Sequence, residues 1–118
     1  MKVSELSGFA LDWAVAKCEG LLAFGYRKTD RFIIELSDGE FEEFCPSTDW
    51  AQGGPIIERE KTAIKENGYG HWFAKVGAGK WMRGPTPLIA AMRCYVGSKL
   101  GEKIDVPEAL LNQKGERE

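Results

Sequence analysis

The sequence predicts an α+β domain in which two main helices pack on one face of an antiparallel sheet built from two β-hairpins. Apolar stretches with helical spacing lie near both ends of the chain, which has 118 residues. Between them, two alternating stretches are each interrupted by a two-residue turn sequence, Asp38-Gly39 and Asn67-Gly68. No repeat or low-complexity linker divides the chain, so residues 1–118 are expected to form a single domain.

The first helix is expected over Phe9–Cys18, a stretch without proline. Ser7 can serve as its N-cap, with Ser4 as the alternative. Gly20 is a natural stop because glycine adopts the left-handed conformation that ends many helices. The apolar side chains recur at the spacing that places them on one helix face; they are Leu11, Ala14, Val15 and Cys18.

Alternating residues over 31–45 predict the first β-hairpin, with the Asp-Gly pair as its turn. A two-residue turn at that position pairs Leu36 with Phe41 on the buried face. The same register places Glu43 on that face, opposite Ile34. Either Glu43 lies at the rim of the sheet or a bulge interrupts the register.

The segments around the hairpins are less clearly defined. Residues 21–30 begin with an apolar run that fits either a strand or an extended loop, and they end in a turn or exposed loop. Gly54-Pro55 favours a short helix over 55–61 with proline at its first position, although a strand remains open there. Residues 62–65 and 71–76 are expected as the strands of the second hairpin. A loop or a short bridge is expected at 81–83.

The second main helix has the clearest start in the sequence. Thr86 is the expected N-cap and Pro87 the first helical residue, and Gly101 is the expected stop. Residues 112–118 are polar and expected to fray. One apolar stripe runs along this helix and comprises Leu88, Ala91, Met92 and Tyr95.

Charge and composition limit the classes of partner. The chain carries 16 basic and 18 acidic residues and has no block of Lys and Arg, so nucleic acid and anionic membranes are not expected as partners. The charged start Met1–Glu5 does not resemble a signal peptide, and no apolar run approaches the roughly 20 residues that span a bilayer. A cytoplasmic protein is therefore expected. The three cysteines lack paired spacing and are expected to be free thiols; they are Cys18, Cys45 and Cys94.

The stretch Cys45–Ile57 has neither strand alternation nor helical spacing, yet it concentrates hydroxyl, carboxylate, indole and amide groups beside a Gly-Gly-Pro turn. We predict that it binds a ligand. Structural alternatives exist: Asp49 can cap a helix near Pro55, Trp50 can cover the core, and Gln52 can bridge loop backbone groups. The predicted ligand-binding residues, including two from the second helix, are Ser47, Thr48, Asp49, Trp50, Gln52, Gly53, Gly54, Thr86 and Arg93.

The two residues from the second helix extend the predicted site. Thr86 marks a helix start, whose free N–H groups can bind an anion. Arg93 lies on an otherwise apolar helix and needs a partner, for which Asp49 is one candidate, or it reaches solvent. Only Asp49 and His71 offer acid–base chemistry. No catalytic residue, metal ligand or cofactor is predicted, since no paired cysteines, second histidine or nucleotide-binding glycine motif is present.

Three segments, taken together, resemble the NinX-like family of small lambdoid bacteriophage proteins, a domain family of unknown function. These are LDWAVA at 11–16, PSTDWAQGGPIIE at 46–58 and GPTPLIAAMR at 84–93. They come in the family's order and are spread across nearly the whole chain, with the least similarity between Gly20 and Phe44. The resemblance implies a phage or prophage origin and a bacterial host cytoplasm, and it transfers no active site.

The leading functional hypothesis is a non-enzymatic module that binds a small polar, nucleotide-like ligand through residues 47–54 and the Thr86 helix start. Such a module could sequester a host metabolite or signal. The alternative is a protein-interaction factor that modulates a host or phage enzyme through a surface formed by Trp50, Trp72 and Trp81. A polar pocket would favour the first hypothesis, and an exposed aromatic patch would favour the second.

Overall fold

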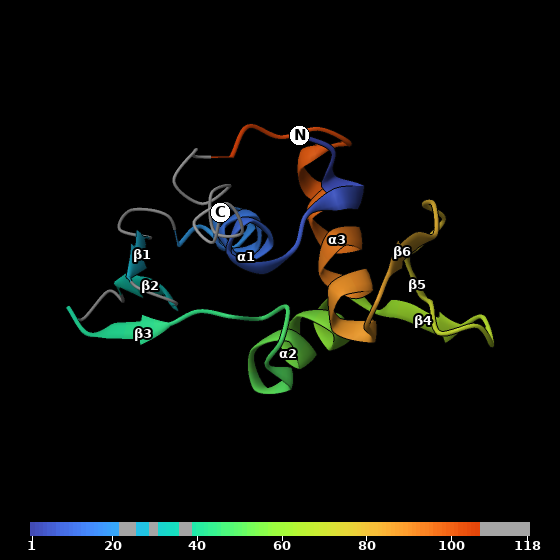
Figure 1. The fold of residues 1–118 in the computed structure, drawn as a ribbon, viewed down its shortest axis with the longest axis horizontal. Helices are drawn as coiled ribbons and strands as arrows, with labels where there is room; N and C mark the ends of the chain where they lie inside the picture. Colours follow the sequence, from blue (N-terminus) through green and yellow to red (C-terminus); the bar gives the residue numbers. More distant parts are fainter. Residues whose placement is uncertain (22–25, 29–30, 36–38, 107–118) are drawn as a thin grey trace, which may run out of the picture.

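The computed structural model describes residues 1–21, 26–28, 31–35 and 39–106 (Figure 1). The chain has two groups of three antiparallel strands, with helices before, between and after them. This arrangement confirms the predicted α+β class. The elements are the 3-10 helix η1 (Val3–Glu5), α1 (Gly8–Cys18), β1 (Tyr26–Lys28), β2 (Arg31–Glu35), β3 (Phe41–Glu43), α2 (Trp50–Glu60), β4 (Thr62–Glu66), β5 (Trp72–Val76), β6 (Met82–Gly84) and α3 (Pro87–Leu100).

The strands form two separate antiparallel sheets, in the orders β1-β2-β3 and β4-β5-β6. The prediction of one sheet built from both hairpins is therefore wrong. In Figure 1 the two sheets lie on opposite sides of the molecule, with α1 and α3 between them. The two helices therefore pack against different sheets: α1 contacts β2, and α3 covers one face of the second sheet.

The register of the first hairpin differs from the predicted one by a single residue. The structure pairs Ile34 with Glu42 rather than with Glu43, and Glu35 with Phe41, which is not the register that a two-residue turn at 38–39 would set. The shift leaves Glu43 exposed and removes the carboxylate that the predicted register placed on the buried face. The predicted pair of Leu36 with Phe41 involves a residue outside the described ones.

Two segments left open by the sequence are strands. Tyr26–Lys28 forms β1 and pairs with β2, which settles part of the open segment 21–30. The second hairpin forms as predicted, with Ile64 opposite Ala74. Met82–Gly84 then adds β6 to β5, so the expected short bridge at 81–83 is the third strand of this sheet.

The helix α2 begins at Trp50, five positions before the predicted start at Pro55. Asp49 is its N-cap, and the carboxylate accepts a hydrogen bond from the N–H of Ala51 at 3.0 Å. Asp followed three residues later by Gln resembles a helix-start signature that the glycines and the proline had masked. Pro55 is exposed inside the helix, where it removes one backbone hydrogen bond.

The N-cap prediction for α3 is confirmed, since the Thr86 hydroxyl oxygen accepts a hydrogen bond from the N–H of Ile89 at 3.1 Å. For α1, Ser7 occupies the cap position without a side-chain cap hydrogen bond. The three cysteines are free, as predicted. The main buried apolar side chains are Val3, Leu6, Leu11, Val15, Phe32, Ile34, Ile56, Met92, Tyr95 and Val96.

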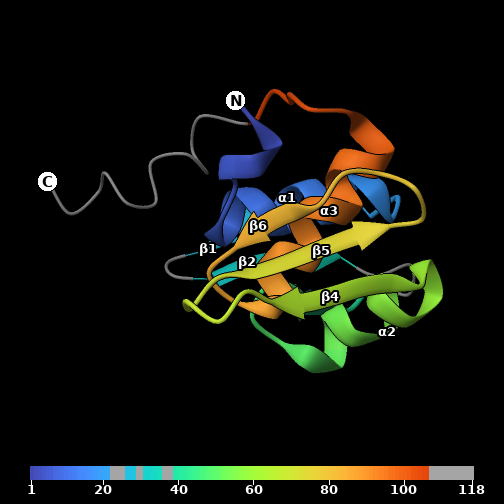
Figure 2. The same ribbon diagram turned by 90° about the vertical axis from the view of Figure 1, so that its right-hand side faces the viewer.

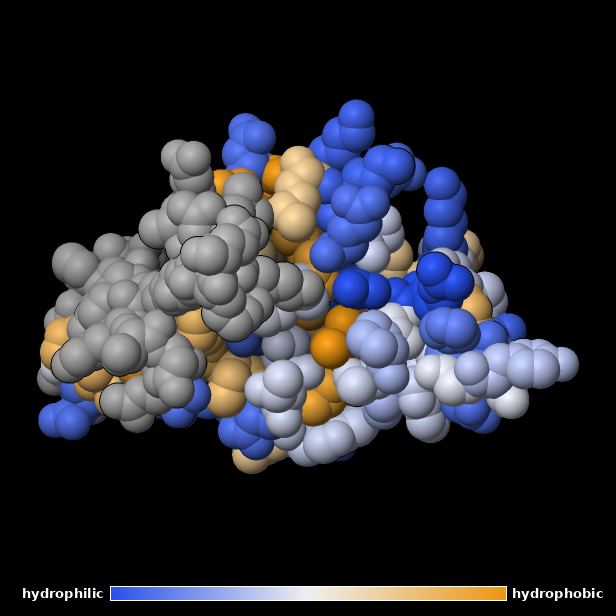
Figure 3. Space-filling view, viewed as in Figure 1, coloured by the Kyte–Doolittle hydropathy of each residue, from blue (hydrophilic) through white to orange (hydrophobic). Residues whose placement is uncertain are grey.

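The N-terminal segment runs beside residues 102–104, where Met1 and Ile104 exchange two backbone hydrogen bonds of 3.1 and 3.0 Å. Residues 112–118, predicted to fray, lie outside the described residues. Figure 3 shows a mainly hydrophilic surface on the side of the second sheet, with hydrophobic residues visible only in small areas. Among the described residues, no helix is both long and apolar enough to cross a membrane.

Candidate functional site

The predicted ligand-binding stretch folds as two structures. Residues 46–48 form a turn, closed by hydrogen bonds from the N–H groups of Thr48 and Asp49 to the Cys45 carbonyl at 3.0 and 2.9 Å. The remaining residues form the first turns of α2. Asp49 therefore has the structural role that the sequence analysis kept as an alternative, because its carboxylate is engaged by the helix it caps.

Gln52 is also held by the protein itself. Its side-chain oxygen accepts a hydrogen bond from the Cys45 N–H at 2.6 Å. Its side-chain amide donates to the Glu43 carbonyl at 2.9 Å and to the Glu42 carboxylate at 3.3 Å. These contacts fasten the end of β3 to the first turn of α2. The amide thus bridges backbone groups and has little capacity left for a ligand.

The two glycines of α2 have different surroundings. A Cβ added at Gly53 would lie 2.4 Å from the Pro46 carbonyl oxygen and 2.6 Å from a methyl group of Leu88. At Gly54 the nearest atom would be a ring carbon of Trp50 at 3.9 Å. Gly53 therefore permits α2 to pack closely against the turn and α3. At Gly54 there is room for a Cβ atom.

Arg93 does not reach the predicted site. Its guanidinium donates to the Leu6 carbonyl at 2.7 Å and to the Arg83 carbonyl at 2.9 Å. Burial, with a smaller contribution from the Arg83 charge, lowers the pKa of Arg93. Asp49, one candidate partner from the sequence, is not the partner that the structure gives: Arg93 ties α3 to the end of η1 and to β6.

Four predicted site residues meet in one shallow hollow between the starts of α2 and α3. The hollow has a volume of about 240 Å³. Trp50 stands at its rim with 55% of its surface exposed, so the indole is not the core lid considered from sequence. The lining residues are Ser47, Thr48, Trp50, Thr86, Pro87, Leu88 and Ile89.

Ser47, which lines the hollow, contacts a buried carboxyl group that the sequence analysis did not select. Asp12 of α1 is 3% exposed and accepts a hydrogen bond from the Ser47 N–H at 3.0 Å. Burial raises the pKa of Asp12 to about 7, against a smaller lowering by Ser47. The Ser47 hydroxyl itself is buried without a hydrogen bond of ordinary geometry. A carboxylate between Leu11 and Trp13, on a helix whose other charged residue, Lys17, lies in the last turn, was the available sequence signal.

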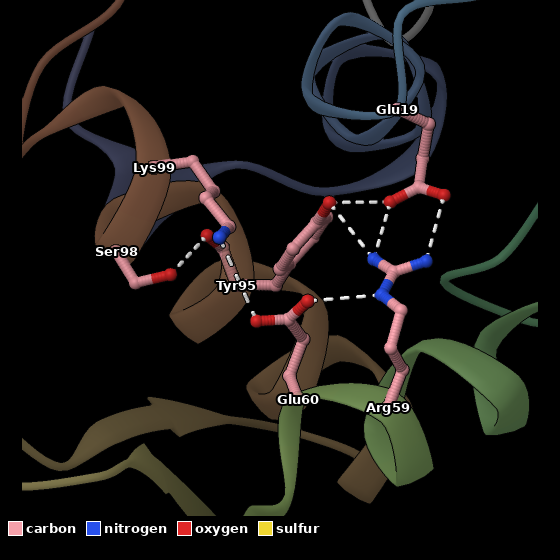
Figure 4. Close-up of polar contacts among 6 residues, drawn as sticks. All are labelled: Glu19, Arg59, Glu60, Tyr95, Ser98 and Lys99. Atoms are coloured by element: carbon pink, nitrogen blue, oxygen red, sulfur yellow. Dashed lines mark hydrogen bonds and ion pairs between the residues drawn. The ribbon is translucent and has the colours of Figure 1, made fainter.

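A second polar cluster joins the C-terminal ends of the three helices (Figure 4). Arg59 of α2 donates to both carboxylate oxygens of Glu19 at 3.2 and 2.7 Å and to the Tyr95 hydroxyl at 3.0 Å. Tyr95 of α3 also donates a short hydrogen bond to Glu19. Arg59 further pairs with Glu60, which Lys99 approaches at 3.7 Å. No sequence spacing could reveal this cluster, because its members are far apart in the chain.

The electrostatics of this cluster indicate a structural role. Burial acts to raise the pKa of Glu19, but hydrogen bonds from Arg59 and Tyr95 outweigh it and lower that pKa. Burial and the Glu19 hydrogen bond raise the pKa of Tyr95. The Glu19 carboxylate is thus held ionised and the Tyr95 phenol is held protonated. Neither group is prepared to exchange a proton near neutral pH, as a general acid or base must.

The remaining acid–base candidate, His71, is exposed at the start of β5. Its backbone N–H donates to the Asn67 side chain at 3.3 Å within the turn of the hairpin. Within residues 1–21, 26–28, 31–35 and 39–106, no three His, Cys, Asp or Glu side chains gather as a metal site requires.

The three tryptophans of the alternative hypothesis do not form one surface. Trp72 is half-buried and packs against the core beneath α3. Trp81 lies beside the amino groups of Lys65 and Lys75, at 4.2 and 5.0 Å from the ring centre. Trp50 stands at the hollow beside α2. A single aromatic patch is therefore not present among them.

In a comparison with protein families, the model of the family described as "Bacteriophage P22, NinX" matches residues 2–99. This span includes every predicted site residue and the whole of the fold from η1 to nearly the end of α3. No curated protein matches the chain.

Proposed function

This chain belongs to the bacteriophage P22 NinX family, and we propose that it is a non-enzymatic binding module for a small polar ligand with a planar, nucleotide-like ring. One observation carries the proposal. Residues from two segments far apart in sequence, both of which carry predicted ligand-binding residues, converge on one hollow with an exposed indole at its rim. Because the family is a phage family, we infer the cytoplasm of the bacterial host as the place of action.

The hollow fits one part of such a ligand. Pockets that enclose a whole drug-sized molecule measure about 300–1,000 Å³, whereas this one has about 240 Å³. A planar ring can stack on the exposed face of Trp50. The Thr86 hydroxyl accepts from Ile89 and keeps its own proton for donation. Thr48 contributes a second hydroxyl, whose contact with the Cys45 carbonyl is long at 3.4 Å.

Catalysis is left out of the proposal because the candidate acid–base groups are engaged or apart. Asp49 accepts a hydrogen bond as a helix cap, and His71 belongs to the β4–β5 turn region. Asp12 has a pKa of about 7, the range of a general base, but it lies beneath Ser47 with 3% of its surface exposed. A group so enclosed supports the turn and has little access to a substrate.

The alternative, a protein-interaction factor, has less support. It depended on one surface shared by Trp50, Trp72 and Trp81, and these side chains lie in three different environments. Hot spots of protein interfaces gather near the centre of one contact region. Separate tryptophans do not supply such a region.

The proposal is tested by mass spectrometry of small molecules released from protein purified out of bacteria, followed by calorimetric titration of each candidate. The informative variant is Trp50→Ala, which should fold because the side chain is largely exposed. Tyr69→Ala is the control, since it removes an exposed aromatic side chain that belongs to neither hollow. We expect Trp50→Ala to weaken binding at least tenfold and Tyr69→Ala to leave it unchanged. Equal affinity in the Trp50 variant, or no bound molecule and no titrating nucleotide, would overturn the proposal.

A further inference from the structure

The outer face of the β4-β5-β6 sheet is open to solvent. Figure 2 shows α3 behind this sheet and nothing in front of it. Because side chains alternate between the two faces of a strand, those of Ile64, Trp72 and Met82, which pack against the core, mark the inner face. The outer face is formed by Ala63, Lys65, Phe73, Lys75, Trp81 and Arg83.

Aromatic and basic side chains alternate across this face. Lys65 lies opposite Phe73, and Phe73 lies opposite Arg83, so one row of the sheet reads cation, aromatic, cation. Continuing the same register by one pair brings Trp81 opposite Lys75. The amino groups of Lys65 and Lys75 lie 4.2 and 5.0 Å from the centre of the Trp81 ring, which confirms that all three share the face.

Charge on this face has one sign. Its three charged side chains, Lys65, Lys75 and Arg83, are all basic. Cations gathered on a surface attract polyanions and speed their association. The chain as a whole has a net charge of −2, so the positive face is a local feature that total charge conceals.

A hollow of about 320 Å³ continues the face beyond Trp81. Lys2, Lys80 and Lys103 line it together with Trp81. Among the described residues that line it, Glu102 is the one acidic side chain, and it pairs with Lys80 at 3.2 Å on the exposed surface. The basic surface thus extends from the sheet into a recess beside the tryptophan, large enough for one base or sugar.

We propose that this face, Lys65, Phe73, Lys75, Trp81 and Arg83, binds single-stranded nucleic acid. Bases stack on Phe73 and Trp81, and the cations contact the phosphates. Single-strand binding surfaces combine these two features, because every base has a planar face and every nucleotide a negative charge. Exposed sheets that carry aromatic side chains bind unpaired bases in the same way.

The lysines do not block the ring. An exposed cation–π contact contributes about 0.5–1 kcal/mol, whereas stacking of a base on an aromatic ring contributes about 1–3 kcal/mol. A base can therefore replace the amino groups over Trp81. The long side chains of Lys65 and Lys75 then remain within reach of the phosphates on either side. A double helix presents its bases stacked and paired, so it cannot use the aromatic rings.

An acidic protein segment is the competing occupant of a basic surface. It would use the cations and have no need of the two aromatic rings. The face is therefore better matched to a polymer in which every unit carries both a negative charge and a planar ring. Dependence of binding on Trp81 separates the two occupants experimentally.

The test measures fluorescence anisotropy of labelled single-stranded dT12 and rU12 with the full chain at about 50 mM salt. We expect both to bind, a duplex of the same length to bind at least tenfold more weakly, and Trp81→Ala to weaken single-strand binding by roughly tenfold or more. Lys65→Ala combined with Lys75→Ala should reduce the slope of log K against log salt by about 1.4. Lys17→Ala, which changes a lysine away from this face and beside Trp13, should have no effect.

Several outcomes would overturn the proposal. Absence of single-strand binding at this salt concentration would do so. Equal binding of the duplex, with no loss in Trp81→Ala, would show a general polyanion surface. Displacement of the oligonucleotide by polyglutamate at equal charge concentration, together with insensitivity to Trp81→Ala, would identify an acidic protein partner instead. Circular dichroism of each variant confirms that the fold is retained.

Discussion

Gln52→Ala distinguishes a structural residue from a ligand-binding one. In the structure, Gln52 accepts from the Cys45 N–H at 2.6 Å and donates to the Glu43 carbonyl at 2.9 Å. Its third hydrogen bond, at 3.3 Å, goes to the exposed Glu42 carboxylate. Alanine at this position removes all three contacts and leaves the Cys45 N–H, which is partly buried, without its acceptor.

The magnitude follows from these contacts. A typical hydrogen bond contributes a net of about 0.5–1.5 kcal/mol, and a buried group left unsatisfied adds to the loss. The two bonds to backbone groups therefore predict a decrease of about 2 kcal/mol in the free energy of unfolding. The exposed contact with Glu42 adds little. For a domain of this size, the melting temperature should fall by roughly 10 °C.

Urea unfolding followed by circular dichroism measures the change. Asp49→Asn is the matched control in the same turn, because asparagine caps helices as well as aspartate does. We expect this control to stay within about 0.5 kcal/mol of the parent. The reasoning is refuted if Gln52→Ala is equally neutral, since the side chain would then be free for a ligand.

Three further predictions concern packing, capping and pH. Gly53→Ala should destabilise by about 3 kcal/mol because its Cβ meets the adjoining turn, whereas Gly54→Ala should be neutral or stabilise by up to about 1 kcal/mol; similar losses in chemical denaturation for both would contradict the packing. Thr86→Ala should lose about 1 kcal/mol, the contribution of a helix cap, and an unchanged denaturation midpoint would mean that the cap contributes nothing. Asp12 has a pKa of about 7 in the folded chain against an ordinary value of 3.8, so stability present below pH 4 should be lost as pH rises to 7. Asp12→Asn should abolish that part of the slope, and an identical pH profile would refute it.

Local chemistry explains the elements that could be predicted. The Thr86-Pro87 pair combines a capping hydroxyl with a residue already restricted to helical φ, and the helix begins there. The second hairpin was found because alternating residues flank an Asn-Gly turn. These patterns act over a few residues, so the sequence alone contains them.

The start of α2 was not predicted correctly. Glycine and proline commonly lie at helix ends, so Gly54-Pro55 favoured a start at Pro55, whereas Asp49 caps the helix and Trp50 begins it. Packing decided the outcome, because Ile56 is buried and Gly53 allows the helix to approach the turn at Pro46. Tertiary contacts outweighed the unfavourable intrinsic propensity of glycine and proline.

That the hollow binds a ligand stays a prediction. The hollow unites Trp50 with Thr86, which the sequence analysis had placed in one site. Arg93 is held by the Leu6 and Arg83 carbonyls instead, a contact no spacing rule provides. The basic face was missed because its cations lie singly on three strands and only the fold brings them together.

The hollow between α2 and α3 should bind a small planar polar ligand. The most direct test is a ¹H–¹⁵N NMR titration of the isotope-labelled protein with nucleoside 5′-monophosphates and cyclic mononucleotides. We predict saturable shifts at the backbone amides of residues 47–50 and 88–89 and at the Trp50 indole, and the loss of these shifts in Trp50→Ala. Shifts confined to other parts of the molecule, or no saturable shift with any nucleotide, would contradict it.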